Sequence, residues 1–172
     1  MNENFLYGAL WGIIFGILLA WGIPAHAASR IEFLGGVSVS NSISDQHARG
    51  WSIEQQTPTQ FGTWNFGYLN EGHMGKYGDK RDGIYAMRKF SYPFTENIQT
   101  SFAIGPYFTS TTITQPDGIH YRDTYRLDLL AGATVRYRLT DNLGLMARWN
   151  HVIFAASKDS DVFLIGFSVR GD

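Results

Sequence analysis

The side chains that could do chemistry in this chain are carboxylates, arginines, histidines and serines, because the sequence contains no cysteine. Thiol catalysis, disulfides and Cys-ligated zinc are therefore excluded. The remaining candidates fall into three groups: charged residues at alternate positions, a polar stretch near residue 71 and a stretch near residue 151. No phosphate-binding loop or zinc-ligand spacing is present. The sequence therefore predicts neither a bound cofactor nor a metal.

The first group consists of charged residues that alternate with apolar ones and would share one face of a sheet. In the clearest stretch, Tyr125 to Arg138, every second residue is apolar or aromatic. We predict that the intervening charged side chains point into a narrow lumen, where opposite charges must pair because an unpaired buried charge is costly. The predicted lumen residues are Glu32, Glu54, Arg126, Asp128, Arg136 and Arg148. The alternative is a regulated conduction path through the same lumen.

The second group lies in a stretch that we expect to be a long loop, residues 70–81. Glu71 and His73, two positions apart, could form an acid–base pair or bind a metal. Arg81 and Asp82 stand at the end of the same stretch. The alternative is a hydrogen-bond network that only orders the loop.

The third group surrounds His151. An activated serine needs a base within hydrogen-bond reach and a further group that orients the base. The available residues are His151, Ser157, Ser160 and Asp161. No spacing among them demands that geometry, so the sequence favours a non-enzymatic protein. A hydrolase with its site near His151 is the alternative.

Strands must position these residues, because apolar residues recur with period two and no helical period is found after residue 28. We predict eight strands, within residues 31–40, 51–54, 63–68, 82–92, 100–108, 125–138, 143–150 and 163–170. Short connections (56–60, 93–97, 139–142) alternate with longer ones (41–48, 70–81, 109–122, 154–160). Short turns at one end and long loops at the other are typical of outer-membrane barrels.

The apolar stripe of residues 125–138 is long and has a tyrosine near each end. At about 3.3 Å per residue and a 45° tilt, twelve residues rise about 28 Å. An outer-membrane barrel has an apolar band about 25 Å tall with aromatic residues at both interfaces. We therefore predict an all-β fold, an eight-stranded antiparallel up-and-down transmembrane β-barrel over residues 28–172 in the bacterial outer membrane. A soluble lipocalin-like barrel, with its apolar face inside, is the alternative.

The N-terminus has a different pattern. An apolar run from Phe5 to Ile23 is followed by Pro24 and by Ala25-His26-Ala27. This is the pattern of a secretory signal peptide, so we predict that residues 1–27 are a signal peptide cleaved after Ala27. The leader has no Lys or Arg, and an uncleaved membrane anchor is the alternative.

Composition limits the partners. The chain has 172 residues, a formal net charge of -1 and 15% aromatic residues. This suits one folded domain and excludes a disordered chain and a strongly basic nucleic-acid binder. We expect the protein to contact outer-membrane lipid and lipopolysaccharide, and an envelope protein as a possible partner. We expect no binding to nucleic acid.

The predicted barrel resembles the small eight-stranded outer-membrane barrels, a broad group that includes the OmpA-like transmembrane domain and lipid A-modifying enzymes. The last hairpin is similar to that of the lipid A 3-O-deacylases, in which a catalytic histidine is followed two residues later by the nucleophilic serine. The resemblance implies that His151 matches the histidine, but Ile153 stands at the serine position. The family's supporting acid would fall in an apolar run of the final strand. The resemblance thus implies shared architecture, with a deacylase-like enzyme of rearranged site as the alternative function.

Overall fold

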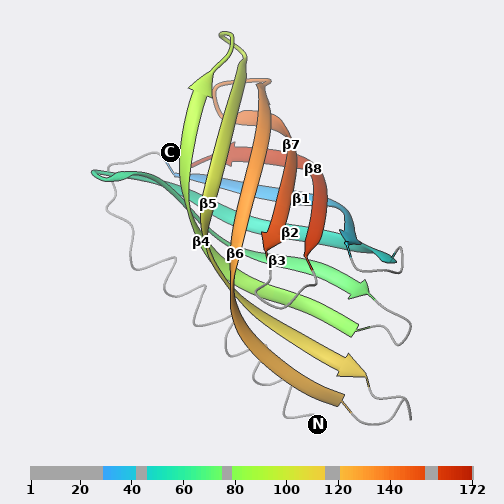
Figure 1. Ribbon diagram of the computed structural model, residues 1–172. Coiled ribbons are helices and arrows are strands. Elements are labelled where there is room, and N and C mark those ends of the chain that lie inside the picture. The colour runs from blue at the N-terminus through green and yellow to red at the C-terminus, as the bar shows by residue number, and fades with distance from the viewer. Residues whose placement is uncertain (1–28, 42–45, 75–78, 115–120, 154–158, 172) are drawn as a thin grey trace.

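The computed structural model describes residues 29–41, 46–74, 79–114, 121–153 and 159–171. They form a closed antiparallel barrel in which each strand pairs with its sequence neighbours and the last strand closes on the first (Figure 1). The strands are β1 (Arg30–Ser40), β2 (Gln46–Thr59), β3 (Gly62–Met74), β4 (Asp79–Pro93), β5 (Ile98–Thr114), β6 (Tyr121–Arg138), β7 (Leu143–Ile153) and β8 (Ser160–Arg170). The predicted eight-stranded all-β barrel is confirmed.

Two predictions fall on parts of the chain that the structure does not describe. The predicted signal peptide, residues 1–27, lies outside the described residues, and so does Ser157. Within the described residues, no helix is long and apolar enough to span a membrane.

The strands run further than the sequence predicts at one end of the barrel. β3 continues to Met74 and β4 begins at Asp79, so most of the predicted 70–81 loop is strand. β5 and β6 likewise take up most of the predicted 109–122 loop. Backbone pairing continues beyond the apolar band, where the side chains are polar and period-two hydropathy no longer marks the strand. We call this the outer end, and the end with short turns the periplasmic end.

The hairpin of β5 and β6 projects beyond its neighbours at the outer end (Figure 1, lower right). β6 pairs with β7 only from Leu129 to Arg138, so its residues 121–128 pair with β5 alone. On the outward face of this projection, the rings of Phe108 and Tyr125 stack with their centroids 6.2 Å apart. The hairpin therefore carries an aromatic pair beyond the end of β7, while β4 still flanks Phe108.

The outer face of the barrel is apolar. On β6, Leu129 and Val135 are exposed, whereas Leu130, Thr134 and Arg136 are buried inside. The same alternation on β8 exposes Phe163, Ile165, Phe167 and Val169. A soluble lipocalin-like barrel would have the opposite orientation, so that alternative is wrong. The facing predicted for β6 is confirmed from Asp128 to Arg136.

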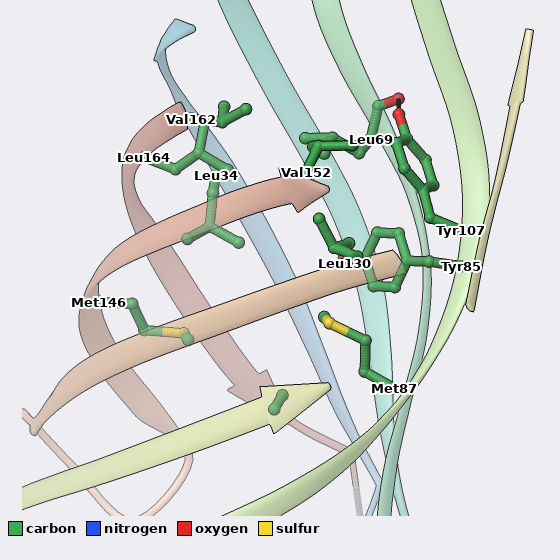
Figure 2. Close-up of a cluster of buried hydrophobic side chains, with 11 residues drawn as sticks. Leu34, Leu69, Tyr85, Met87, Tyr107, Leu130, Met146, Val152, Val162 and Leu164 are labelled. Carbon is green, nitrogen blue, oxygen red and sulfur yellow. Dashed lines mark hydrogen bonds between the residues drawn. The ribbon is translucent and has the colours of Figure 1, made fainter. Parts of the chain in front are cut away.

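The lumen contains apolar side chains beside the predicted charged ones. Eleven apolar or aromatic side chains are buried in it, among them Leu69, Tyr85, Tyr107, Leu130 and Val152 (Figure 2). The Tyr107 hydroxyl donates to the Leu69 carbonyl at 3.2 Å. The interior of an eight-stranded barrel is just wide enough to be filled by side chains, so apolar side chains pack between the polar clusters.

Two glycines of β3 shape the lumen. A Cβ at Gly67 would lie 2.6 Å from the Tyr85 ring, so glycine lets that ring lie against β3. Gly72 has φ +86°, and a Cβ there would lie 2.4 Å from the Arg49 carbonyl oxygen. Gly72 follows a β-bulge, where the register with β4 shifts between Asn70 and Gly72. The bulge leaves Glu71 pointing into the barrel.

The facing of β6 predicts the effect of a charge at Ala133, which is exposed between the outward side chains of Phe102 and Trp149. Ala133→Arg should lower the free energy of unfolding by about 2–4 kcal/mol, the cost of a cation near the bilayer midplane. Urea unfolding in lipid vesicles, followed by tryptophan fluorescence, measures the change. Ala133→Leu is the matched control, since it enlarges the side chain without charge. An equal loss in both variants would contradict lipid exposure of this position.

Candidate functional site

Arg148 on β7 lies at the centre of the lumen and is 4% exposed. Its Nη1 and Nη2 donate to the two carboxylate oxygens of Glu54 at 2.5 and 2.6 Å. Nη2 also donates to Glu32 Oε2 at 2.6 Å, and Nε donates to the Thr134 hydroxyl at 3.0 Å. Arg148 and Glu54 thus form a bidentate guanidinium–carboxylate pair, the geometry that makes arginine the preferred partner for buried acids.

Four further side chains complete this central cluster. Lys89 Nζ lies 3.6 Å from Glu32 Oε1 and donates to Gln56 Oε1 at 3.0 Å. The Tyr85 hydroxyl donates to Glu54 at 2.6 Å, and Asn65 Nδ2 donates to Glu54 at 3.0 Å. The cluster therefore holds two carboxylates, one guanidinium and one ammonium, whose formal charges cancel.

Sequence reasoning placed Glu32, Glu54 and Arg148 in the lumen but missed Lys89 and Tyr85. The sequence carries a weak signal for these two residues. Ile84, Ala86 and Phe90 are apolar at alternate positions of β4, so the intervening Tyr85 and Lys89 must face inward. The outward-facing Arg88 interrupts this alternation of apolar residues, so the pattern is difficult to recognise.

A second buried cluster forms around Glu71, which was predicted on a loop but is a fully buried residue of β3. Its carboxylate accepts hydrogen bonds from Ser160 Oγ at 2.5 Å, from the Tyr107 hydroxyl at 3.2 Å and from Arg81 Nη1 at 3.4 Å. The Ser38 hydroxyl donates to the Glu71 carbonyl oxygen. The bulge thus places an acid inside the outer end of the lumen, where Arg81 balances its charge.

The predicted loop site does not assemble. Glu71 points into the lumen, whereas His73, beyond the bulge, is exposed. Asp82 lies on the outward face of β4, where it accepts a hydrogen bond from the Tyr68 hydroxyl and pairs with Lys80 at 2.8 Å. Of the four predicted residues, Glu71 and Arg81 form an ion pair at 3.4 Å. No group of three metal-ligating side chains is found among the described residues.

The other predicted lumen residues are spread along the barrel. Asp128 is buried and accepts a hydrogen bond from the Thr109 hydroxyl at 2.7 Å. Arg136 is buried near the periplasmic end, and its Nε donates to Ser168 at 2.8 Å. The prediction for Arg126 is wrong, because its side chain is exposed. Arg126 belongs to the part of β6 that has passed the end of β7 and so no longer lines a lumen.

A third polar cluster lies on the outside of the barrel, near the outer ends of β7 and β8. The register of β7 and β8 sets His151 opposite Asp161, with His151 Nδ1 2.9 Å from Asp161 Oδ1. Trp149 Nε1 donates to the same oxygen at 2.7 Å, and Asn41 Nδ2 donates to the other oxygen at 2.8 Å.

This cluster brings together two of the predicted residues, His151 and Asp161. The family's acid position falls in the apolar run of the last strand, whereas Asp161 precedes that run and lies beside His151. The nucleophile has no such counterpart. Ser160 points into the lumen towards Glu71, on the opposite face of the sheet, and Ile153 is exposed on the outer face. The described residues therefore provide an imidazole oriented by a carboxylate, and no serine hydroxyl bonded to it.

No protein-family model matches the chain, and no characterised protein is significantly similar to it in sequence. Among solved structures the chain is similar to Neisserial surface protein A, with 16% identity and a TM-score of 0.64 over 82% of this chain and 96% of that chain. It is also similar to the attachment invasion locus protein of Yersinia pestis (10% identity, TM-score 0.60, 84% and 97% covered). A third is the N-terminal barrel domain of Pseudomonas aeruginosa OprF (11%, 0.57, 85% and 100%).

The fold is that of a small bacterial outer-membrane β-barrel. At these identities the likeness extends to the fold and no further. The exposed apolar band of the chain fits an outer-membrane location, because it is the surface that such a barrel presents to lipid.

The central cluster predicts a strong effect of Arg148→Met. Removing the guanidinium leaves Glu32 and Glu54 buried without their main partner, so the free energy of unfolding should fall by about 3–5 kcal/mol. Urea unfolding of the refolded barrel in detergent micelles at pH 7 measures the loss.

The matched control is the double variant Glu54→Gln, Arg148→Met. It removes one carboxylate together with the guanidinium and leaves Glu32 to balance Lys89, so it should recover most of the lost stability. A double variant as unstable as the single one would show that Arg148 acts through packing and not through charge balance.

Proposed function

We propose that this chain is a non-enzymatic outer-membrane barrel whose outer end is its working surface. The supporting observation is the filled lumen. Arg148, Glu54 and Glu71 are joined to their neighbours by direct hydrogen bonds and are shut off from solvent. Side chains that fill the barrel in this way favour a sealed scaffold over a conduction path, and they leave the loops and strand ends to meet partners.

Lipopolysaccharide is the partner that the outer face fits best. On β2, Arg49 and His47 are exposed outward, just beyond the aromatic pair of Trp51 and Tyr68, whose ring centroids are 5.2 Å apart. Lys80 on β4 lies at this end too, but Asp82 balances its charge at 2.8 Å. Aromatic residues mark the level of the membrane interface. Cations directly above that level would meet the phosphate groups of lipopolysaccharide. The projecting β5–β6 hairpin is the part of the outer end that best suits an envelope protein partner.

The test compares unfolding free energies in vesicles with and without lipopolysaccharide. Lipopolysaccharide should stabilise the native barrel, and the variant Arg49→Gln should lose about 1 kcal/mol of that gain. Arg88→Gln is the control, because Arg88 is exposed at the periplasmic end of β4. The proposed contact is refuted when Arg49→Gln gains as much from lipopolysaccharide as the native chain.

A second candidate function is lipid A deacylation, and the pairing of His151 with Asp161 is the observation that favours it. An imidazole oriented by a carboxylate supplies two of the three groups of a Ser-His-Asp catalytic triad. The missing hydroxyl would have to come from outside the described residues, where Ser157 lies. We regard this pair as an interfacial hydrogen-bond cluster.

Refolded protein incubated with lipid A in detergent separates the two functions. We expect no release of fatty acid by mass spectrometry, because Ile153 provides no nucleophile. Release that is abolished in both His151→Ala and Ser157→Ala would establish the enzyme and overturn the non-enzymatic proposal. Release that survives both substitutions would point to a contaminating hydrolase.

A further inference from the structure

A small polar cavity opens at the periplasmic end of the barrel. Its volume is about 190 Å³, and its polar lining includes Arg30, Arg136, Arg138, Glu96, Asn97 and Gln99. These residues come from the start of β1, the end of β6, and the turn and strand that follow β4. The cavity is much smaller than the sites that hold drug-sized ligands, and it suits one small group.

The arginines of this cavity lack the acidic partners that the other buried cations of the barrel have. Arg148 contacts two carboxylates and Arg81 contacts one. Among the described residues, Arg30, Arg136 and Arg138 form no ion pair with a carboxylate. Arg138 Nη2 donates to the side chain of Asn97 at 3.3 Å.

Arg136 is the most constrained of the three. It is 6% exposed, and its Nε donates to the neutral hydroxyl of Ser168. Its Nη2 has no hydrogen-bond partner. A buried guanidinium without an anion is costly, because burial removes the water that would otherwise solvate the charge. Arg30 and the exposed Arg170 are paired directly opposite each other in the β1–β8 ladder, so this end of the barrel gathers positive charge.

The turn that closes the cavity is held in place before any ligand arrives. The Thr95 hydroxyl accepts hydrogen bonds from the backbone amides of Asn97 and Ile98, at 3.3 and 3.0 Å. The Asn97 carbonyl in turn accepts from the Arg138 amide at 2.8 Å. A fixed turn lowers the entropy cost of binding. Asn97 and Gln99 add neutral side-chain amides to the lining.

We propose that this cavity binds a phosphate-type oxyanion from the periplasmic side. Three arginines against one glutamate give the lining a formal charge of +2, which matches a dianion such as hydrogen phosphate or a lipid phosphomonoester. Guanidinium groups bind tetrahedral oxyanions through paired N–H donors. Here the anion replaces the carboxylate that Arg148 has at the centre of the lumen.

The probe is inorganic phosphate, added at constant ionic strength to the folded full chain in zwitterionic detergent. The side-chain N–H signals of Arg136 and Arg138 in ¹⁵N NMR should shift and saturate with added phosphate. Sulfate, with a similar shape and charge, should compete, and chloride should not.

Two variants locate the binding. Arg136→Gln and Arg138→Gln should each weaken phosphate binding by about tenfold, and the exposed Arg138 keeps the test valid should the Arg136 variant fail to fold. Arg88→Gln, an exposed arginine outside the cavity, is the matched control and should bind as the native chain does. The proposal is overturned by signals that fail to saturate by about 50 mM phosphate, by an equal response to chloride, or by unchanged affinity in both cavity variants.

Nanodiscs show whether the bound oxyanion is a lipid headgroup or free phosphate. If a lipid headgroup fills the cavity, nanodiscs that contain phosphatidic acid should show the shifted signals without added phosphate. If the ligand is free phosphate, discs with and without phosphatidic acid should give the same titration. Either result supports the oxyanion site.

Discussion

A charge that faces the lumen of an eight-stranded barrel has almost no water around it, so it must be balanced by other side chains. The rest of the interior depends on this constraint. Arg148 satisfies it at the centre by pairing with both Glu32 and Glu54, with Lys89 as the second cation. These residues belong to β7, β1, β2 and β4, so the cluster ties together opposite walls of the closed sheet.

The same constraint explains the local irregularities of β3. Gly67 makes room for Tyr85, which lets the tyrosine hydroxyl reach Glu54. The bulge before Gly72 leaves Glu71 inside the barrel, within reach of Arg81 and Ser160. Each irregularity gives a buried carboxylate another hydrogen-bond donor. The backbone of β3 is thus shaped by the acids that the lumen contains.

The fold could be predicted from the sequence because lipid imposes a strict period of two on the outward residues, as from Leu127 to Val135 on β6. The lumen imposes no such pattern, because both apolar and charged side chains, such as Leu130 and Arg136, can be buried there beside suitable neighbours. Lys89 was missed for that reason. The bulge at Glu71 and the register that joins His151 to Asp161 depend on pairing between strands, which hydropathy does not reveal. Arg126 was misplaced because the alternation of β6 continues past the rim of the barrel.

Charge balance changes from one end of the lumen to the other. Arg81 balances the charge of Glu71. In the central cluster, Arg148 and Lys89 balance the two carboxylates of Glu32 and Glu54. At the periplasmic end, Arg136 is buried beside Arg30 and Arg138, with only Glu96 as a carboxylate in the cavity lining. Balanced clusters need nothing from outside and can act as a permanent seal. An unbalanced one gains stability from any anion that can reach it, so the proposed oxyanion site follows from the same constraint that pairs the charges in the middle of the barrel.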